Sequence, residues 1–428
     1  MSMQLPEYAI YLPAVNEAYA RALATEVPST RTFPQGFELA DMEFWRPGTE
    51  KNLWHYPYML HSVGSYTVGQ IPDNAITRRG RTDGLLVGDS GGFQIGNGTM
   101  ALDGLVQGMS GDDACQAWRG NYDARQWILN WLETYTNYAM TIDMPTWATA
   151  SSKSASPFHN CTIGQLTELT VENLKFIDTH RKGRTKWLNV IQGVDFEMSK
   201  LWWDKVKWFP CNGYSLSSFS ARASGLAEFL KIILLMRDEK AFEGERSWLH
   251  VLGVSTAPWA IVFSSIQRGL RATSNARLIV SFDSADPFTT LSEYGDCALL
   301  PNFGDGRDSW VIRYAKKPES PFDIGSMAPL AFRSAIADKL TLGDLNVVAE
   351  QFNPRNFDAF SQAFLMHHNV WTFVETFKTA NKLLFEGDRR GVPDEFKVVT
   401  DMIEHVFSVE DWDSALAGEA SVLANFKR

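Results

Sequence analysis

Short apolar runs recur along the chain, and each one ends in glycine or polar residues before a longer stretch with helical spacing begins. The runs cover residues 58–63, 85–87, 138–142, 187–191, 214–216, 248–254 and 278–282. Continuous apolar runs of this length are typical of strands buried on both faces, as in parallel sheets. The repeated order of strand and helix therefore predicts successive βα units, which fit a doubly wound sheet or a (β/α)8 barrel.

Apolar residues with helical spacing mark the stretches between these runs. The residues 127–135 place Trp and Leu on one helical face, and similar stripes run through 166–177 and 225–236. From about Pro329 onward no strand-like run follows, and the stretch 364–377 again has helical spacing. This part of the chain is predicted to be mainly helical.

Polar side chains follow four of the predicted strands at the point where each strand ends. Asp89 closes LLVGD, Asp143 closes YAMTID, Gln192 closes WLNVIQ and Asp283 closes LIVSFD. In parallel α/β folds the carboxyl ends of the strands form the ligand-binding edge. A helix N-cap explains one such carboxylate, but the same placement in four strands favours a shared site.

Converging carboxylates are compatible with two chemistries. One carboxylate can act as nucleophile while another moves protons, as in displacement at a sugar anomeric carbon. Alternatively, the acids could bind a divalent metal ion. The glutamine and the neighbouring glycines favour recognition of a planar polar ligand over an all-carboxylate metal cage.

Composition and charge narrow the class of protein. The 428 residues are 45% hydrophobic and 21% charged, which is an ordinary globular balance. The net charge of −10 argues against a protein that coats nucleic acid non-specifically, yet it allows a local basic groove. Candidate phosphate contacts are the basic clusters at 78–81 and 181–186, and exposed tryptophans among the fifteen could stack on bases.

The four cysteines and the N-terminus indicate a reducing, cytoplasmic setting. No two cysteines form a C-x-x-C pair, so neither a disulfide scaffold nor a cysteine-rich zinc site is expected. The first residues do not resemble a signal peptide, and the longest apolar runs are too short to span a bilayer. We therefore expect no membrane association.

The segment Gly88–Gly92 reads GDSGG, a sequence that also surrounds the nucleophile of chymotrypsin-like serine proteases. Here it lies too close to the N-terminus for that fold. Neither His55 nor His61 lies in Ala-Ala-His-Cys, and Phe93 stands where the proteases have proline. A serine protease is therefore not expected.

Read together with Phe93 and Gln94, the same segment resembles the Asp-Ser-Gly-Gly-Phe-Gln signature of the tRNA-guanine transglycosylases. Further pieces of the chain resemble motifs of that family in the family's order. They are Thr141–Pro145, Val190–Gly193, Gly213–Ser218, Leu252–Val254, Ser281–Ser284 and Met366–Asn369. The resemblance covers roughly residues 58–380, which is most of the chain.

The resemblance implies a (β/α)8 TIM barrel that exchanges guanine for a 7-deazaguanine base and needs no cofactor. Asp283 would be the nucleophile on C1′, and Asp89 would be the general acid and base. The base itself would be bound by a further set of residues: Asp143, Gln192 and Gly193 at its polar edge, Phe93 and Leu252 at its faces, and Ser217 and Ser218 through their backbone.

Under this resemblance residues 1–328 would form the barrel, with loop insertions near 97–113 and 146–161. Residues 329–428 would form a helical part that closes the barrel. The family's zinc site beyond the nucleophile cannot form here, because no cysteine follows Cys297 and His367 or His368 has no thiolate partner. We expect no metal in that place.

The departures from the family pattern bear on the substrate. The Pro-Thr-Arg stretch that contacts tRNA in the family reads Ala285–Thr290 in this chain. Lost tRNA-reading elements beside retained chemical residues favour DNA as the substrate, as in phage and bacterial paralogues that place 7-deazaguanines in DNA. The alternatives are base exchange on tRNA or a free nucleoside, a non-catalytic binding subunit, and a carboxylate-pair glycosidase acting on other sugars. A helper protein or a homodimer is compatible with each alternative.

Overall fold

The computed structural model describes residues 5–29, 31, 33–34, 36, 38–217, 225–318, 326–345, 357–419, 422–423 and 426. Ser218, one of the predicted base-binding residues, lies outside this described part of the chain.

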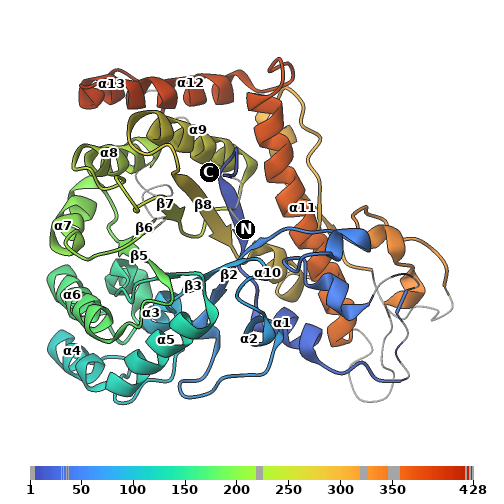
Figure 1. The fold of residues 1–428 in the computed structure, drawn as a ribbon, viewed down its shortest axis with the longest axis horizontal. Helices are drawn as coiled ribbons and strands as arrows, with labels where there is room; N and C mark the ends of the chain where they lie inside the picture. The colour runs from blue at the N-terminus through green and yellow to red at the C-terminus, as the bar shows by residue number, and fades with distance from the viewer. Residues whose placement is uncertain are drawn as a thin grey trace.

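Eight parallel strands form the centre of the molecule, in the sheet order β1-β8-β7-β6-β5-β4-β3-β2. The sheet closes on itself because Ala14, directly after β1, bridges Leu60 of β2, and the Val15 N–H donates to the Leu60 carbonyl at 2.9 Å. The predicted (β/α)8 barrel is therefore confirmed (Figure 1). The strands are β1 (Ile10–Pro13), β2 (Tyr58–Ser62), β3 (Leu85–Asp89), β4 (Tyr138–Met140), β5 (Lys186–Ile191), β6 (Gly213–Leu216), β7 (Trp248–Val251) and β8 (Ile279–Ser284).

Helices surround the barrel, and the apolar stripes predicted from the sequence lie on them. Stripe 127–135 lies on α5, stripe 166–177 on α6, stripe 225–236 on α8 and stripe 364–377 on α11. The α-helices are α1 (Glu17–Ala24), α2 (Ala75–Arg78), α3 (Gly92–Asn97), α4 (Gly111–Gly120), α5 (Tyr122–Tyr135), α6 (Ile163–His180), α7 (Phe196–Val206), α8 (Gly225–Asp238), α9 (Ala257–Thr273), α10 (Asp286–Ser292), α11 (Ala359–Phe385), α12 (Asp394–Ser408) and α13 (Trp412–Gly418).

The sequence pattern did not predict β1. Its four residues, IYLP, are too short to stand out as an apolar run, yet all four are buried. Tyr11 points away from the barrel axis and packs against Phe377 of α11 with ring centroids 4.8 Å apart. Residues 10–13 therefore form a strand because they pair with β8, and not because of their local sequence.

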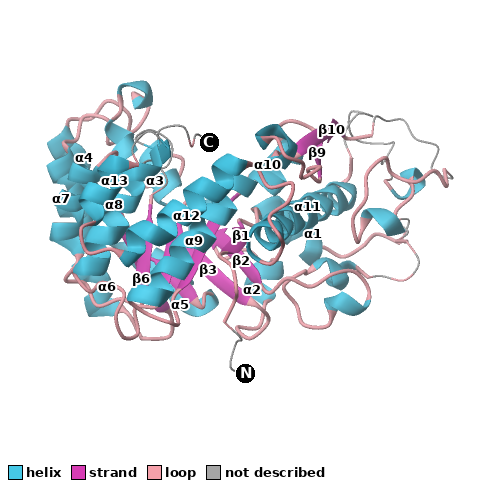
Figure 2. Cartoon of the chain, turned by 90° about the horizontal axis from the view of Figure 1, so that it is seen from above, coloured by secondary structure: helices cyan, strands magenta, loops and turns pink. Residues whose placement is uncertain are grey.

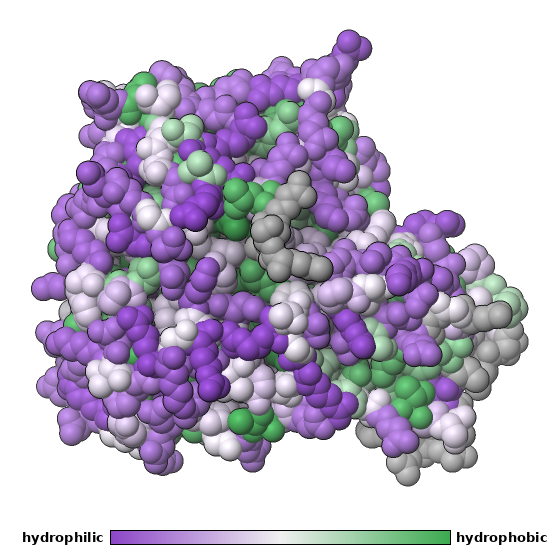
Figure 3. All heavy atoms as spheres, viewed as in Figure 1, coloured by the Kyte–Doolittle hydropathy of each residue, from purple (hydrophilic) through white to green (hydrophobic). Residues whose placement is uncertain are grey.

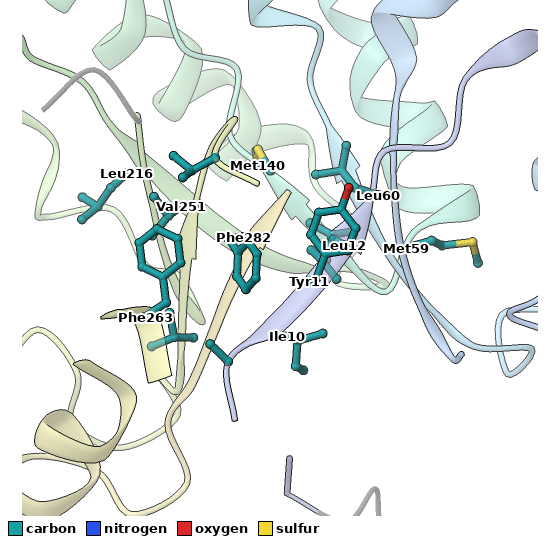
Figure 4. Close-up of a cluster of buried hydrophobic side chains, with 14 of the residues drawn as sticks. Ile10, Tyr11, Leu12, Met59, Leu60, Met140, Leu216, Val251, Phe263 and Phe282 are labelled. Atoms are coloured by element: carbon teal, nitrogen blue, oxygen red, sulfur yellow. The ribbon is translucent and has the colours of Figure 1, made fainter. Parts of the chain in front are cut away.

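Side chains of each strand alternate between the barrel interior and the surrounding helices. Phe282 of β8 faces outward, where its ring centroid lies 5.2 Å from that of Phe263 on α9. Figure 4 shows this pair within the buried cluster that β1, β2, β4, β6, β7 and β8 share. Because Phe282 points outward, its neighbours Ser281 and Asp283 point inward, which sets the position of the site described below.

The helices at the C-terminus pack on the outside of the barrel. Helix α11 lies against α1, α9 and β1, so it covers the seam between β1 and β8, and α12 lies along α9 (Figure 1). Before them an antiparallel hairpin, β9 (Asp296–Leu299) and β10 (Arg313–Lys316), contacts α10 and α11. The expected boundary at residue 328 falls between β10 and α11.

Most tryptophans belong to the core. Eight of them are less than 2% exposed: Trp45, Trp118, Trp131, Trp187, Trp202, Trp248, Trp259 and Trp310. Trp208, by contrast, is 46% exposed. Trp202 and Trp203 therefore pack in the core, and of the neighbouring three tryptophans only Trp208 is exposed enough to stack on a base. The face shown in Figure 3 is mostly hydrophilic, with scattered apolar residues.

Among the described residues, no helix combines the length and the apolar character needed to cross a membrane.

The close approach of β6 and β7 generates a prediction about Gly213. A Cβ atom at this position would lie 2.2 Å from the Trp248 carbonyl oxygen, so Gly213→Ala must displace one of the two strands. We expect a loss of about 1–3 kcal/mol in the free energy of unfolding, measured by urea denaturation. Gly120→Ala, in α4 with nothing within 4 Å of the added atom, should leave stability unchanged or slightly higher. Equal stability of the two variants would contradict this packing.

Candidate functional site

Four of the residues predicted from strand ends meet at the carboxyl-terminal mouth of the barrel. Asp89 ends β3, Asp143 follows β4, Gln192 follows β5 and Asp283 lies near the end of β8. The charge of Asp283 acts on the carboxyl group of Asp89, the charge of Asp89 acts on that of Asp143, and Asp143 is hydrogen bonded to Gln192. Residues far apart in the sequence thus form one cluster, as the strand-end pattern predicted.

Asp143 and Gln192 form a buried polar pair. The Gln192 side-chain amide donates from Nε2 to Asp143 Oδ2 at 2.5 Å, and the Thr146 hydroxyl donates to Gln192 Oε1 at 3.4 Å. Burial raises the pKa of Asp143 to about 7, and the nearby charge of Asp89 adds to this effect, while the Gln192 hydrogen bond opposes it. Near neutral pH the protonated and the ionised forms of the Asp143 carboxyl group are therefore both populated.

Asp89 is suited to carry a proton. Burial raises its pKa, and the negative charge of Asp283 raises it further. A hydrogen bond from the Ser62 hydroxyl, another from the Gly91 backbone and the proximity of His250 oppose that shift. A carboxyl group with a raised pKa next to a second carboxyl group is a common arrangement for general acid–base chemistry.

Asp283 is held at one oxygen. Its Oδ1 accepts a hydrogen bond from the Gly253 backbone N–H at 2.9 Å, and His250 Nε2 lies 3.2 Å from the same oxygen. The Asp283 side chain is 11% exposed, while that of His250 is completely buried. Both of these contacts are made to Oδ1 and neither is made to Oδ2.

The aromatic and apolar residues predicted to hold the ring lie on the same side of the barrel. Phe93, in the first turn of α3, is 62% exposed and its ring centroid lies 5.7 Å from that of Trp147. Leu252, directly after β7, is half-buried, and its N–H donates to the Leu216 carbonyl. Both therefore lie beyond the carboxyl ends of their strands, Phe93 after β3 and Leu252 after β7.

The structure describes only part of the remaining residues that were predicted to contact the base. Ser217 directly follows β6 and is 9% exposed, whereas Ser218 is not described. Gly193 has a φ of 142°, and a Cβ atom there would lie 2.5 Å from the Ser199 backbone nitrogen at the start of α7. Glycine is therefore required at position 193 by the turn itself.

Sequence reasoning missed His250, the Gly253 N–H and Trp147. A signal for His250 exists in the sequence, because it interrupts the apolar strand WLHV just as Ser281 interrupts IVSFD. A polar residue inside a strand buried on both faces requires a partner. The N–H of Gly253 has no such signal, because any residue carries one.

The two basic clusters lie at the other end of the barrel. Residues 78–81 precede β3 and residues 181–186 precede β5, so both lie at the amino ends of the strands. Arg79 donates to the carbonyls of Gly80 and Tyr135, and Arg81 to those of Glu133 and Arg184. These arginines connect loops, and they are too far from the mouth to contact a phosphate next to the site.

A hollow of about 800 Å³ also lies at the amino-end face, bordered by Arg181, Lys207 and Trp208. Arg181 is paired with Asp178 and Lys207 with Asp204 and Glu239, while Arg246, which also borders the hollow, donates to the Lys240 carbonyl. The hollow is separate from the carboxylate cluster.

The histidine pair on α11 is part of the packing. His367 Nδ1 contacts the Tyr19 hydroxyl at 2.8 Å, and His368 Nε2 contacts the Ala298 carbonyl at 2.8 Å. Burial lowers the pKa of both to about 3 and about 4 respectively. Within the described ranges no group of three or more His, Cys, Asp or Glu side chains could hold a metal ion.

No family model matches this chain, and no curated protein is significantly similar to it in sequence.

The raised pKa of Asp143 generates a prediction about stability. Between the ordinary aspartate value of 3.8 and about 7, the folded protein keeps a proton that the unfolded chain has released. Stability therefore falls as pH rises through this window. Asp143→Asn removes this dependence, so its melting temperature should rise relative to wild type between about pH 4.5 and about pH 8. Asp123→Asn, on the exposed first turn of α5, controls for the loss of one charge. A constant difference between wild type and Asp143→Asn would refute the assignment.

Proposed function

We propose that this protein exchanges guanine in DNA for a 7-deazaguanine base through a covalent glycosyl-enzyme intermediate. The proposal rests on one observation: two pairs of side chains with different chemical uses lie together at the mouth of the barrel. A buried carboxyl–amide pair, Asp143 and Gln192, lies beside two electrostatically coupled carboxyl groups, Asp89 and Asp283. The first pair suits a purine edge, and the second suits displacement at C1′.

The proposed reaction proceeds in two balanced displacements. Oδ2 of Asp283 attacks C1′, the C1′–N9 bond breaks, and Asp89 gives a proton to the departing guanine. The incoming 7-deazaguanine then returns a proton to Asp89 as its N9 attacks C1′ and the ester bond to Asp283 breaks. The raised pKa of Asp89 favours the protonated form that the first step requires.

The polar pair matches the hydrogen-bonding edge of guanine. Ionised Asp143 accepts from the N1–H and N2–H donors, and the second Nε2 hydrogen of Gln192 is free to donate to O6. Exposed Phe93 and half-buried Leu252 flank the mouth, where they can cover the faces of the ring. An ordinary sugar hydrolase has no use for such an edge-reading pair.

The choice of DNA rests on the sequence departures and is supported by charges around the mouth. Lys153 follows β4 and lies 5.0 Å from the Trp147 ring, and β10 carries exposed Arg313 and Lys316, of which Lys316 is paired with Asp296. Tyr314 of β10 is hydrogen bonded to Thr290 on α10, so the hairpin adjoins the end of β8. Cations here could contact phosphates while one guanine leaves the stack, a step that costs a few kcal/mol.

Substitution of the proposed nucleophile tests the chemistry. Asp283→Ala should lower guanine exchange about a thousandfold or more and abolish any covalent protein–DNA adduct trapped under denaturing conditions, with the fold intact by circular dichroism. Asp123→Ala, on the exposed surface, should exchange normally. Normal exchange by Asp283→Ala would remove this residue from the mechanism, and a folded wild type that exchanges nothing would favour a non-catalytic binding subunit.

Competition between polymers tests the substrate. With radiolabelled guanine, wild type should label duplex DNA at least about tenfold faster than tRNA, a difference of about 1.4 kcal/mol in transition-state binding. Product is counted after each polymer is separately precipitated and digested. Equal or faster labelling of tRNA would instead favour base exchange on tRNA.

A further inference from the structure

A layer of polar side chains lies inside the barrel, directly below the carboxylate cluster. Ser215, His250 and Ser281 occupy paired positions on β6, β7 and β8, and all three are 0% exposed. Polar groups without water are costly unless they are hydrogen bonded. Asp283 lies two residues beyond Ser281, so its side chain points to the same side of β8.

The hydrogen bonds in this layer have a defined order of donors and acceptors. The Trp248 indole Nε1–H donates to Ser281 Oγ at 2.7 Å, and Ser281 Oγ lies 2.8 Å from His250 Nδ1. An indole N–H can only donate, so the Ser281 oxygen accepts there and its own proton is available for His250 Nδ1. On the other side of the ring, Asp283 Oδ1 can only accept and lies 3.2 Å from Nε2, so this arrangement favours the neutral His250 tautomer with its proton on Nε2.

We infer that His250 is a positioning residue for Asp283, oriented by Ser281 and Trp248. The inference rests on the proposed function, because it assigns the role to the nucleophile of that reaction. Two N–H groups, from His250 Nε2 and the Gly253 backbone, fix Oδ1 and present Oδ2 to C1′. A fixed carboxylate saves the orientation cost of reaching an attack geometry.

The contact between His250 and Asp283 is a close approach and not yet a straight hydrogen bond. Catalytic contacts commonly have this form before the substrate binds and become aligned in the complex. The Nε2–H of His250 would then oppose the negative charge on Oδ1 while Oδ2 forms the ester. The contact is made to Asp283 and not to the base-binding pair, so substrate binding should depend on it weakly, although His250 also acts on the Asp89 carboxyl group through its charge.

His61 provides a matched control. It is also a fully buried strand histidine, but it lies on the outer face of β2, where Nδ1 contacts the Val15 carbonyl at 2.7 Å and the ring packs near Trp131. Replacing it disturbs the same kind of environment without reaching Asp283. A loss of activity that is specific to position 250 therefore separates positioning from general packing.

Kinetics of four variants test the inference. We expect His250→Phe to lower kcat for guanine exchange about 10- to 100-fold with KM nearly unchanged, since only the orientation of Asp283 is lost. His250→Gln restores an N–H donor near the Nε2 position and should recover most of kcat. Ser281→Ala keeps the histidine but frees its tautomer, so an intermediate loss is expected. His61→Gln should be as active as wild type. Equal losses in the Gln and Phe variants at position 250, or no loss in either, would overturn the role.

Imidazole ¹⁵N shifts give a readout that does not depend on the exchange reaction. In protein labelled with ¹⁵N-histidine, the signal absent from His250→Gln identifies His250. We expect a protonated Nε2 and an unprotonated Nδ1 in wild type, and a mixture of tautomers in Ser281→Ala. A protonated Nδ1 in wild type would refute the hydrogen-bond direction. If this pattern is found but the wild type exchanges no base, the proposed function fails, while the hydrogen-bonded series from Trp248 through Ser281 and His250 to Asp283 stands.

Discussion

The mutual repulsion of three carboxyl groups in one buried barrel mouth is the constraint on which the site depends. Parallel strands bring Asp89, Asp143 and Asp283 together, and the charges of Asp89 and its neighbours act on one another. The structure resolves the repulsion by giving each group a different partner. Asp143 is bonded to an amide, Asp89 to the hydroxyl of Ser62, and Asp283 to a backbone N–H. Three chemically identical side chains thereby acquire different surroundings, and the pKa is raised at two of them, Asp89 and Asp143.

Side chains that fill the barrel interior below the mouth also contribute to the arrangement of the site. Trp248 fills the space beside Tyr138, with ring centroids 4.5 Å apart, and Gly213 provides the room for it. The indole that closes the lower barrel is also the first donor in the series that reaches Asp283. The Trp248 side chain therefore both packs the barrel interior and donates the first hydrogen bond of this series. Figure 2 shows the N-terminus at the lower edge of the molecule and the β9–β10 hairpin at the opposite edge, beside α10 and α11.

The barrel and the cluster could be read from sequence because both follow from short patterns. A buried parallel strand is a continuous apolar run, and an acid at its end stands out, as at LLVGD and LIVSFD. β1 could not be found in this way, because its four residues become a strand only by pairing with β8. The basic clusters were assigned to phosphate contacts because sequence gives charge but not the end of the barrel on which a loop lies. Which oxygen of Asp283 is held is likewise a matter of geometry, since a backbone N–H leaves no trace in the sequence.

The pairing of β1 with β8 has a consequence for the way the protein is made. Leu12 of β1 lies opposite Asp283 of β8, so during synthesis the first barrel strand must wait for the eighth before the two can pair. Such distant contacts form late and slowly. A chain interrupted during synthesis anywhere before β8 has neither a closed barrel nor Asp283. The cluster of three carboxyl groups is thereby confined to polypeptides that extend at least through β8.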